Sequence, residues 1–286
     1  MSLSSKYYVI TPAKNEEKYI AFTLDSMIKQ TIKPLKWIIV DDGSTDRTVE
    51  IIKKYQKDND WIEIISLDNK QEQKLYGSKV IRAFNAGYNL VKDKKFDFIV
   101  KLDADLSFTP DYFKEIATAF DKNSKLGICG GFIVENEDDF VKKNLRYPRV
   151  QGAIKSVRTE CFKDIDGFME ANGWDGLDML KALFLGWEVG NIPFKVLHLR
   201  PQTFEYRSLN FFQSNGYTHY VQGNDLFLTI VRVMVLLKEK PYLFASMSYL
   251  KGYLKALFSN EPKLVDKELS KFIRLYHYKR LLNFKR

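Results

Sequence analysis

Short apolar runs alternate with helical patterns through the first 105 residues, and this order constrains the fold more than any other feature of the chain. Runs of β-branched and aromatic residues cover residues 7–10, 37–40, 61–67 and 96–102. Between the first two runs, Ile20, Leu24 and Ile28 recur at helical spacing. Strands that alternate with helices in this way pair mainly in parallel, with helices on both faces of the sheet. The sequence therefore predicts an α/β fold with a Rossmann-like, mainly parallel sheet.

The later residues divide into two further parts. With 286 residues, of which 45% are hydrophobic, the chain can bury one full core. We interpret residues 1–105 and 106–223 as the two halves of one domain. Residues 224–286 are rich in Leu, Phe, Tyr and Lys, with apolar residues at helical spacing. They predict a basic helical extension of that domain.

Carboxylates cluster where two of the predicted strands end. Asp41 and Asp42 follow the second strand in an Asp-Asp-Gly turn, and Asp103 and Asp105 follow the fourth. The carboxyl ends of parallel strands border one ligand crevice, so these side chains are expected to face the same space. Carboxylates that converge there repel one another, and Mg²⁺ or Mn²⁺ shared with a diphosphate would offset that repulsion. The alternative for each segment, taken singly, is an ordinary polar turn.

Four segments in this order resemble the motifs of inverting family 2 glycosyltransferases of the GT-A fold. They are Ile10–Glu17 after the first strand, Val40–Asp46 after the second, Asn85–Gly87 in the next helix, and Leu102–Asp105 after the fourth strand. The resemblance implies transfer of a sugar, with inversion, from a UDP- or GDP-linked donor to an acceptor hydroxyl, in cell-surface polysaccharide or glycolipid assembly. Residues 1–105 would bind the nucleotide sugar, and residues 106–223 would bind the acceptor and carry the catalytic base.

The resemblance also implies which residues bind the donor. The candidates are Pro12, Ala13, Asn15, Glu16, Asp41, Asp42, Lys79, Arg82, Asp103, Ala104 and Asp105. Among them, Pro12, Glu16 and Asp42 are expected to line the nucleotide base and ribose. Asp103 is expected near the ribose, and Asp105 is expected to hold Mn²⁺ or Mg²⁺ on the diphosphate.

The sequence does not single out one basic residue for the donor phosphates. Phe84 stands where the family often has an arginine, so the basic group for the phosphates is either Lys79 or Arg82. Related folds often complete the metal shell with a histidine about as far past the acidic motif as His198. The metal-ligand candidates are therefore Asp103, Asp105 and His198. A structural role is the alternative for a lone histidine in a strand.

Direct displacement at an anomeric carbon requires a carboxylate to accept the proton of the acceptor hydroxyl. Residues 172–181 resemble the acidic motif that opens a helix on the acceptor side in this family. Counting back from Gly186, Asp175 falls at the position of the catalytic base, and Asp178, one helical turn further on, is the alternative. We favour Asp175. An acidic residue at this place is also typical of a helix start, which it stabilises electrostatically.

Three residues are candidates for acceptor binding. Trp174 stands where the family commonly has a glutamate, and its indole is suited to stacking on a sugar face. Gly131 and Gln151, each next to a further glycine, mark places where the backbone would approach a sugar closely. The alternatives are a core side chain for Trp174 and ordinary turns for the other two.

The positive charge of the chain is concentrated toward its C-terminal end. The whole chain carries +9, and residues 238–286 hold 12 Lys and Arg against 4 Asp and Glu, a net charge of +8. In residues 249–258 Lys alternates with Tyr, Leu and Phe, which is typical of a helix that lies on an anionic membrane. We expect peripheral membrane association there, with a sugar or a lipid-linked sugar as acceptor. Solvent-exposed helices of a basic protein are the alternative.

Location and rival functions follow from the same sequence. Residues 1–15 contain no signal-peptide core, and no apolar run reaches the roughly 20 residues of a spanning helix, so we expect a cytoplasmic location at the inner face of the membrane. A pI near 9.2 suggests nucleic-acid binding, but an acidic crevice opposes it. A nucleotidyltransferase typically has a glycine-rich basic loop after the first strand, whereas Pro12–Glu17 is acidic and free of glycine.

Overall fold

A computed structural model of the chain describes residues 5–67, 78–135, 150–200, 208–238 and 240–283. The chain forms two compact units, Met1–Pro201 and Gln202–Arg286. The division falls before the expected boundary at residue 224, so the first helix after it belongs to the helical unit.

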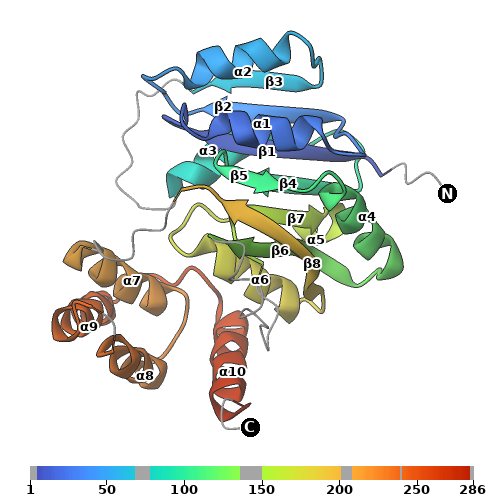
Figure 1. The fold of residues 1–286 in the computed structure, drawn as a ribbon. Helices are drawn as coiled ribbons and strands as arrows, with labels where there is room; N and C mark the ends of the chain where they lie inside the picture. Colours follow the sequence, from blue (N-terminus) through green and yellow to red (C-terminus); the bar gives the residue numbers. More distant parts are fainter. Residues whose placement is uncertain (1–4, 68–77, 136–149, 201–207, 239, 284–286) are drawn as a thin grey trace. The chain divides into compact units, whose positions relative to one another are not determined.

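One sheet forms the centre of the first unit. Within the described residues its strands are β1 Tyr7–Ala13, β2 Lys36–Asp41, β3 Ile62–Ser66, β4 Phe98–Leu102, β5 Leu106–Phe108, β6 Leu126–Val134, β7 Ile154–Arg158 and β8 Glu188–His198. Their order is β3-β2-β1-β4-β7-β6-β8-β5, and Figure 1 shows β3 at the top with β2 and β1 below it. The strands β3, β2, β1 and β4 are parallel to one another, and β7 is antiparallel to β4 and β6. Strands β6 and β8 are parallel, and β5 is antiparallel to β8. The sheet is therefore mixed, and its first four strands match the predicted parallel order.

Helices cover both faces of this sheet because the strands are apolar on both faces. The helices are α1 Ile20–Ile28, α2 Thr48–Gln56, α3 Ser78–Tyr88, α4 Tyr112–Lys122, α5 Thr159–Asp164 and α6 Trp174–Phe184. Along β1, Tyr7 and Val9 pack with α1, α2 and α4, whereas Tyr8 and Ile10 pack with α3, α5 and α6. This alternation is the period of two that a strand imposes on its side chains. The predicted α/β fold of the GT-A type is confirmed.

The second unit is helical, and its described residues form α7 Leu209–Val221, α8 Leu226–Leu236, α9 Leu243–Phe258 and α10 Lys267–Asn283. Helices α7 and α9 cross at two glycines. A Cβ on Gly216 would collide with the backbone carbonyl of Tyr249, and a Cβ on Gly252 would collide with that of Gln213. Glycine at both positions lets the two helix backbones approach closely.

This crossing corrects one expectation about residues 249–258. Tyr249, Tyr253 and Ala256, which were expected on a lipid surface, are buried in the core of the helical unit. The pattern of aromatic and basic residues indicates that α9 has an apolar face, but it does not say what covers that face. In the structure α7 packs against it. Across the described helices, none is both long enough and apolar enough to cross a membrane.

Candidate active site

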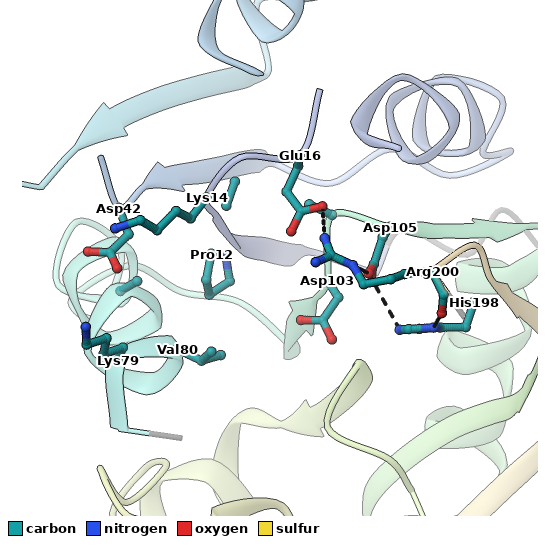
Figure 2. Close-up of a pocket in the computed structure, with 13 residues that line it drawn as sticks. Pro12, Lys14, Glu16, Asp42, Lys79, Val80, Asp103, Asp105, His198 and Arg200 are labelled. Carbon is teal, nitrogen blue, oxygen red and sulfur yellow. Dashed lines mark hydrogen bonds and ion pairs between the residues drawn. The ribbon is translucent and has the colours of Figure 1, made fainter. Parts of the chain in front are cut away.

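A cavity of about 420 Å³ lies at the carboxyl ends of β1, β2 and β4 and at the end of β8. Its lining consists of Pro12, Ala13, Lys14, Glu16, Asp42, Lys79, Val80, Ala83, Asp103, Ala104, Asp105, His198 and Arg200. Figure 2 shows Glu16, Asp103 and Asp105 around Arg200 on one side of this pocket, and Lys14, Asp42 and Lys79 on the other. Most of the donor-binding candidates thus share one space, at the edge of the sheet that the strand directions predict.

Two candidates hold the pocket loops together and do not line the pocket. Asn15 has a left-handed backbone, with φ of 55°, and its Oδ1 accepts a hydrogen bond of 2.8 Å from the amide of Thr45. Its own amide donates to Ser44 Oγ at 3.0 Å. Asp41 is buried, and its Oδ1 accepts from the Ser44 amide at 3.1 Å. Asn15 therefore ties the loop after β1 to the loop after β2, and Asp41 stabilises the turn after β2.

The two basic candidates on α3 occupy different places. Arg82 Nη2 donates to Asp42 Oδ1 at 3.2 Å, which fixes the orientation of this nearly buried carboxylate at the pocket wall. Lys79, about one helical turn earlier, lines the pocket itself. Of the two, Lys79 is the one that lines the pocket, and Arg82 contacts the side chain of Asp42.

Asp105 and His198 form the corner that best fits a divalent cation. His198 Nε2 lies 3.6 Å from Asp105 Oδ2. His198 Nδ1 lies 2.6 Å from the backbone carbonyl oxygen of Arg200. A carbonyl oxygen can only accept, so we assign a proton to Nδ1, and Nε2 is the ring nitrogen that lies toward Asp105. A backbone carbonyl that accepts from the second ring nitrogen is the usual support of a metal-binding histidine.

The third metal candidate lies in a different arrangement. Asp103 forms an ion pair with Lys101, whose side chain is 3% exposed. Burial raises the pKa of Asp103, and the charge of Lys101 opposes that rise. Among the described residues, no three His, Cys, Asp or Glu side chains are gathered as a metal cluster. Mg²⁺ and Mn²⁺ bind few protein ligands and take phosphate and water oxygens for the rest, so Asp105 and His198 are the residues that would hold such an ion.

Arg200 is a pocket residue that the sequence analysis missed. Its Nε lies 3.1 Å from Asp105 Oδ2, and its Nη2 forms an ion pair with the carboxylate of Glu16. Burial raises the pKa of Glu16 to about 7; the charge of Arg200 lowers it and that of Asp105 raises it. The signal in the sequence was the spacing, because residues two apart in an extended segment lie on the same side, and His198 precedes Arg200 by two.

The two candidates for the catalytic base differ in accessibility. Asp178 is buried, and both of its carboxylate oxygens lie 2.8 Å from Lys155 Nζ. Burial raises the pKa of Asp178 to about 6, although the charge of Lys155 lowers it. Asp175 is half-buried in the first turn of α6, and its backbone carbonyl oxygen accepts from Lys155 Nζ at 2.7 Å. The N-cap of α6 is Gly173, so Asp175 does not cap the helix. Of the two carboxylates, that of Asp175 belongs to the more exposed residue.

The acceptor candidates have mostly structural surroundings. Trp174 is 8% exposed and packs against Phe168, with ring centroids 4.9 Å apart. Gly131 is buried in β6, and a Cβ there would lie 2.8 Å from the ring of Tyr112. Both residues therefore have a packing role in the core, and their role in acceptor binding stays a prediction. Gln151 is half-buried and precedes Gly152, whose added Cβ would lie 3.0 Å from the Cβ of Asp175. The backbone next to Gln151 therefore lies close to the proposed base.

The sequence profile of glycosyl transferase family 2 matches residues 8–168. That span is more than half of the 286 residues and contains the ends of β1, β2 and β4 that form the pocket. The chain belongs to glycosyl transferase family 2. The family segment therefore includes Asp42, Asp103 and Asp105, whereas the proposed base and His198 lie beyond it.

A relative and two solved structures extend the comparison. The chain is 25% identical over 209 residues to the poly-β-1,6-N-acetyl-D-glucosamine synthase of Staphylococcus aureus, and the match covers 68% of this chain and 46% of that protein. The chain thus spans less than half the length of that curated relative. Mannosyltransferase PcManGT from Pyrobaculum calidifontis, solved with GDP-Man and Mn²⁺, has a TM-score of 0.58 at 17% identity, over 98% of this chain and 81% of that one. S. aureus TarS, solved with UDP-GlcNAc, has a TM-score of 0.53 at 21% identity, over 89% of this chain and 73% of that one. Both likenesses support the GT-A fold.

Proposed function

We propose that this chain transfers a sugar from a UDP- or GDP-linked donor to an acceptor hydroxyl with inversion at the anomeric carbon. The observation that carries this proposal is the corner of Asp105 and His198 within a pocket that also holds Asp42 and Lys79. An oriented carboxylate, a histidine ring nitrogen and an ammonium group around one cavity suit a nucleoside diphosphate and a divalent cation. The GDP-Man and UDP-GlcNAc bound by the two solved structures support a sugar nucleotide as donor.

In this proposal the pocket residues bind and orient the donor. Asp42, held by Arg82, accepts hydrogen bonds from the base, and Glu16 and Asp103 do so from the ribose. Lys79 contacts the phosphates, and the Pro12 and Ala13 backbone forms the wall behind the nucleotide. Mn²⁺ or Mg²⁺ held by Asp105 and His198 would neutralise the negative charge that develops on the departing diphosphate. The Mn²⁺ of the mannosyltransferase structure supports this cofactor.

The proposed chemistry is a single displacement. The acceptor oxygen attacks the anomeric carbon from the face opposite the diphosphate, and the bond from that carbon to the diphosphate oxygen breaks. Asp175 accepts the proton of the acceptor hydroxyl. Lys155 holds the first turn of α6 through the Asp175 backbone and the Asp178 side chain, so the position of the base depends on this lysine.

We further propose that the acceptor is a sugar or a lipid-linked sugar in surface polysaccharide or glycolipid assembly. The polysaccharide synthase of S. aureus supports this class of product. A lipid-linked acceptor would lie at a membrane, and the +8 charge of residues 238–286 supports peripheral association with an anionic leaflet.

The proposal is tested by incubating the full chain with a panel of UDP- and GDP-sugars, Mn²⁺ and candidate acceptors, and by measuring release of the nucleoside diphosphate. Asp175→Asn is expected to lower release by about 100-fold or more, because a positioned general base contributes on that order. It should leave nucleotide affinity unchanged. Asp178→Asn serves as the comparison, and a larger loss of turnover there, at equal stability, would transfer the base role to Asp178.

A further inference from the structure

Exposed apolar side chains of the second unit gather where α8 ends and α9 begins. We call this surface the hairpin tip and define it as Met234, Leu237, Tyr242, Leu243, Phe244 and Met247, all of which are exposed. Ser246 Oγ donates to the carbonyl oxygen of Val233 at 3.1 Å, so the end of α8 and the start of α9 lie against each other.

The hairpin tip is separate from the face that forms the core. On the inner sides of the two helices, Leu228, Leu236, Ala245 and Tyr249 are buried. On α8 the exposed apolar residues continue as a stripe of Phe227, Ile230 and Met234, at helical spacing. Single exposed apolar residues are normal on a protein surface, whereas several that lie next to one another mark an interaction site.

The charges beside the hairpin tip favour an anionic partner. The sequence between the two helices contains Lys238, Glu239 and Lys240, which gives a net charge of +1, and both lysines are exposed. Apolar side chains next to lysines match a lipid leaflet, in which acyl chains lie beneath anionic headgroups. A two-fold dimer through the same surface would bring the lysines of both copies together, and like charges across an interface are unfavourable.

We propose that the hairpin tip inserts into an anionic membrane leaflet, with Phe244, Met247 and Met234 in the acyl-chain region and Lys238 and Lys240 at the headgroups. This assignment rests on the proposed membrane association and does not depend on glycosyl transfer. It moves the membrane contact from residues 249–258, whose apolar side is largely buried, to the opposite end of α9.

The test is sedimentation of the full chain with vesicles of phosphatidylcholine, with and without about 30% phosphatidylglycerol. The wild-type chain should bind the anionic vesicles more tightly than the neutral ones. Phe244→Glu/Met247→Glu should lower the affinity by about 100-fold or more, because each of the two large side chains that leaves the acyl region loses about a tenfold factor or more. Phe258→Glu is the matched control, since Phe258 is 81% exposed at the other end of the same helix. It should bind like the wild type.

Each contrary result has a distinct meaning. If the wild type binds neither vesicle, the membrane association itself fails. If the wild type binds and Phe258→Glu loses affinity while Phe244→Glu/Met247→Glu does not, the hairpin tip is the wrong surface. Lys238→Glu/Lys240→Glu should remove the preference for anionic vesicles, and an unchanged preference would overturn the headgroup assignment. A wild-type dimer in light scattering that dissociates in Phe244→Glu/Met247→Glu would assign the tip to a second copy of the chain.

Discussion

Replacing Lys155 with methionine should leave the buried carboxylate of Asp178 without its ionic partner. The Lys155 side chain is 0% exposed and that of Asp178 is 3% exposed, and both Asp178 oxygens lie 2.8 Å from the ammonium. Methionine has a similar length and no charge, so Lys155→Met removes the partner while nearly preserving the shape. Removing one member of a buried ion pair costs about 3–5 kcal/mol, and we expect a loss in this range at pH 8.

The pH dependence of this loss has a definite sign. Asp178 already has its pKa raised by burial to about 6, and removing the charge of Lys155 should raise it further. A carboxyl whose pKa rises on folding stabilises the protein fully below its unfolded pKa, and this contribution is lost as the pH rises through the folded pKa. In the wild type the stabilising contribution of protonated Asp178 is lost completely a little above pH 6. In Lys155→Met, where the pKa of Asp178 is higher, this contribution persists to higher pH. The difference between the two proteins should therefore be smaller at pH 5 than at pH 8.

Chemical denaturation of the two proteins at both pH values measures this difference, with Lys155→Met/Asp178→Leu as the matched control. Replacing both partners with apolar groups is often close to neutral, so the double variant should recover to within about 1–2 kcal/mol of the wild type. The reasoning is refuted if Lys155→Met is as stable as the wild type at pH 8. It is also refuted if the double variant is no more stable than the single one.

Three further predictions concern metal, packing and the nucleotide. His198→Ala should lower Mn²⁺ affinity in the presence of UDP or GDP by about 10-fold or more, measured calorimetrically, whereas His219→Ala in the helical unit should leave it unchanged. Gly216→Ala should destabilise the chain by about 1–3 kcal/mol or more in thermal unfolding, because helices α7 and α9 must separate; Gly176→Ala, where an added Cβ meets no atom within 4 Å, should not. Arg82→Met should weaken nucleotide binding by loosening the carboxylate that it orients, and unchanged nucleotide affinity would remove that role.

The parts of the fold that follow from local chemistry were predictable. The strand runs, the helices between them and the turn glycine after Asp42 are encoded by neighbouring residues, so the order of the first four strands is clear from the sequence. The pocket at their carboxyl ends then follows from the parallel order, and it contains Glu16 and Asp105.

The pairing of distant charges could not be read from the sequence. Arg200 meets Glu16 across 184 residues, and no local pattern links them. Lys101 and Lys155 interrupt apolar strands, and they are tolerated because the structure gives each a carboxylate and the ring of Trp174, whose centroid lies 5.7 and 5.0 Å from their ammonium nitrogens.

Asp41 and Asp42 belong to one motif, but their side chains make different contacts. Asp41 is the last residue of β2 and turns its carboxylate to the Ser44 amide, while Asp42 reaches the pocket. The motif marks both, and the alternation of side chains at a strand end decides between them. The roles given to the donor, base and acceptor residues remain predictions.

Calorimetric titration of the full chain with UDP and GDP, each with and without Mn²⁺, tests the central claim most directly. At least one of these nucleotides should bind, Mn²⁺ should tighten its binding, and Asp105→Asn should lose about tenfold or more of the affinity measured with Mn²⁺. If neither nucleotide binds under either condition, or if Asp105→Asn binds the nucleotide with Mn²⁺ as tightly as the wild type does, the proposed donor site is wrong.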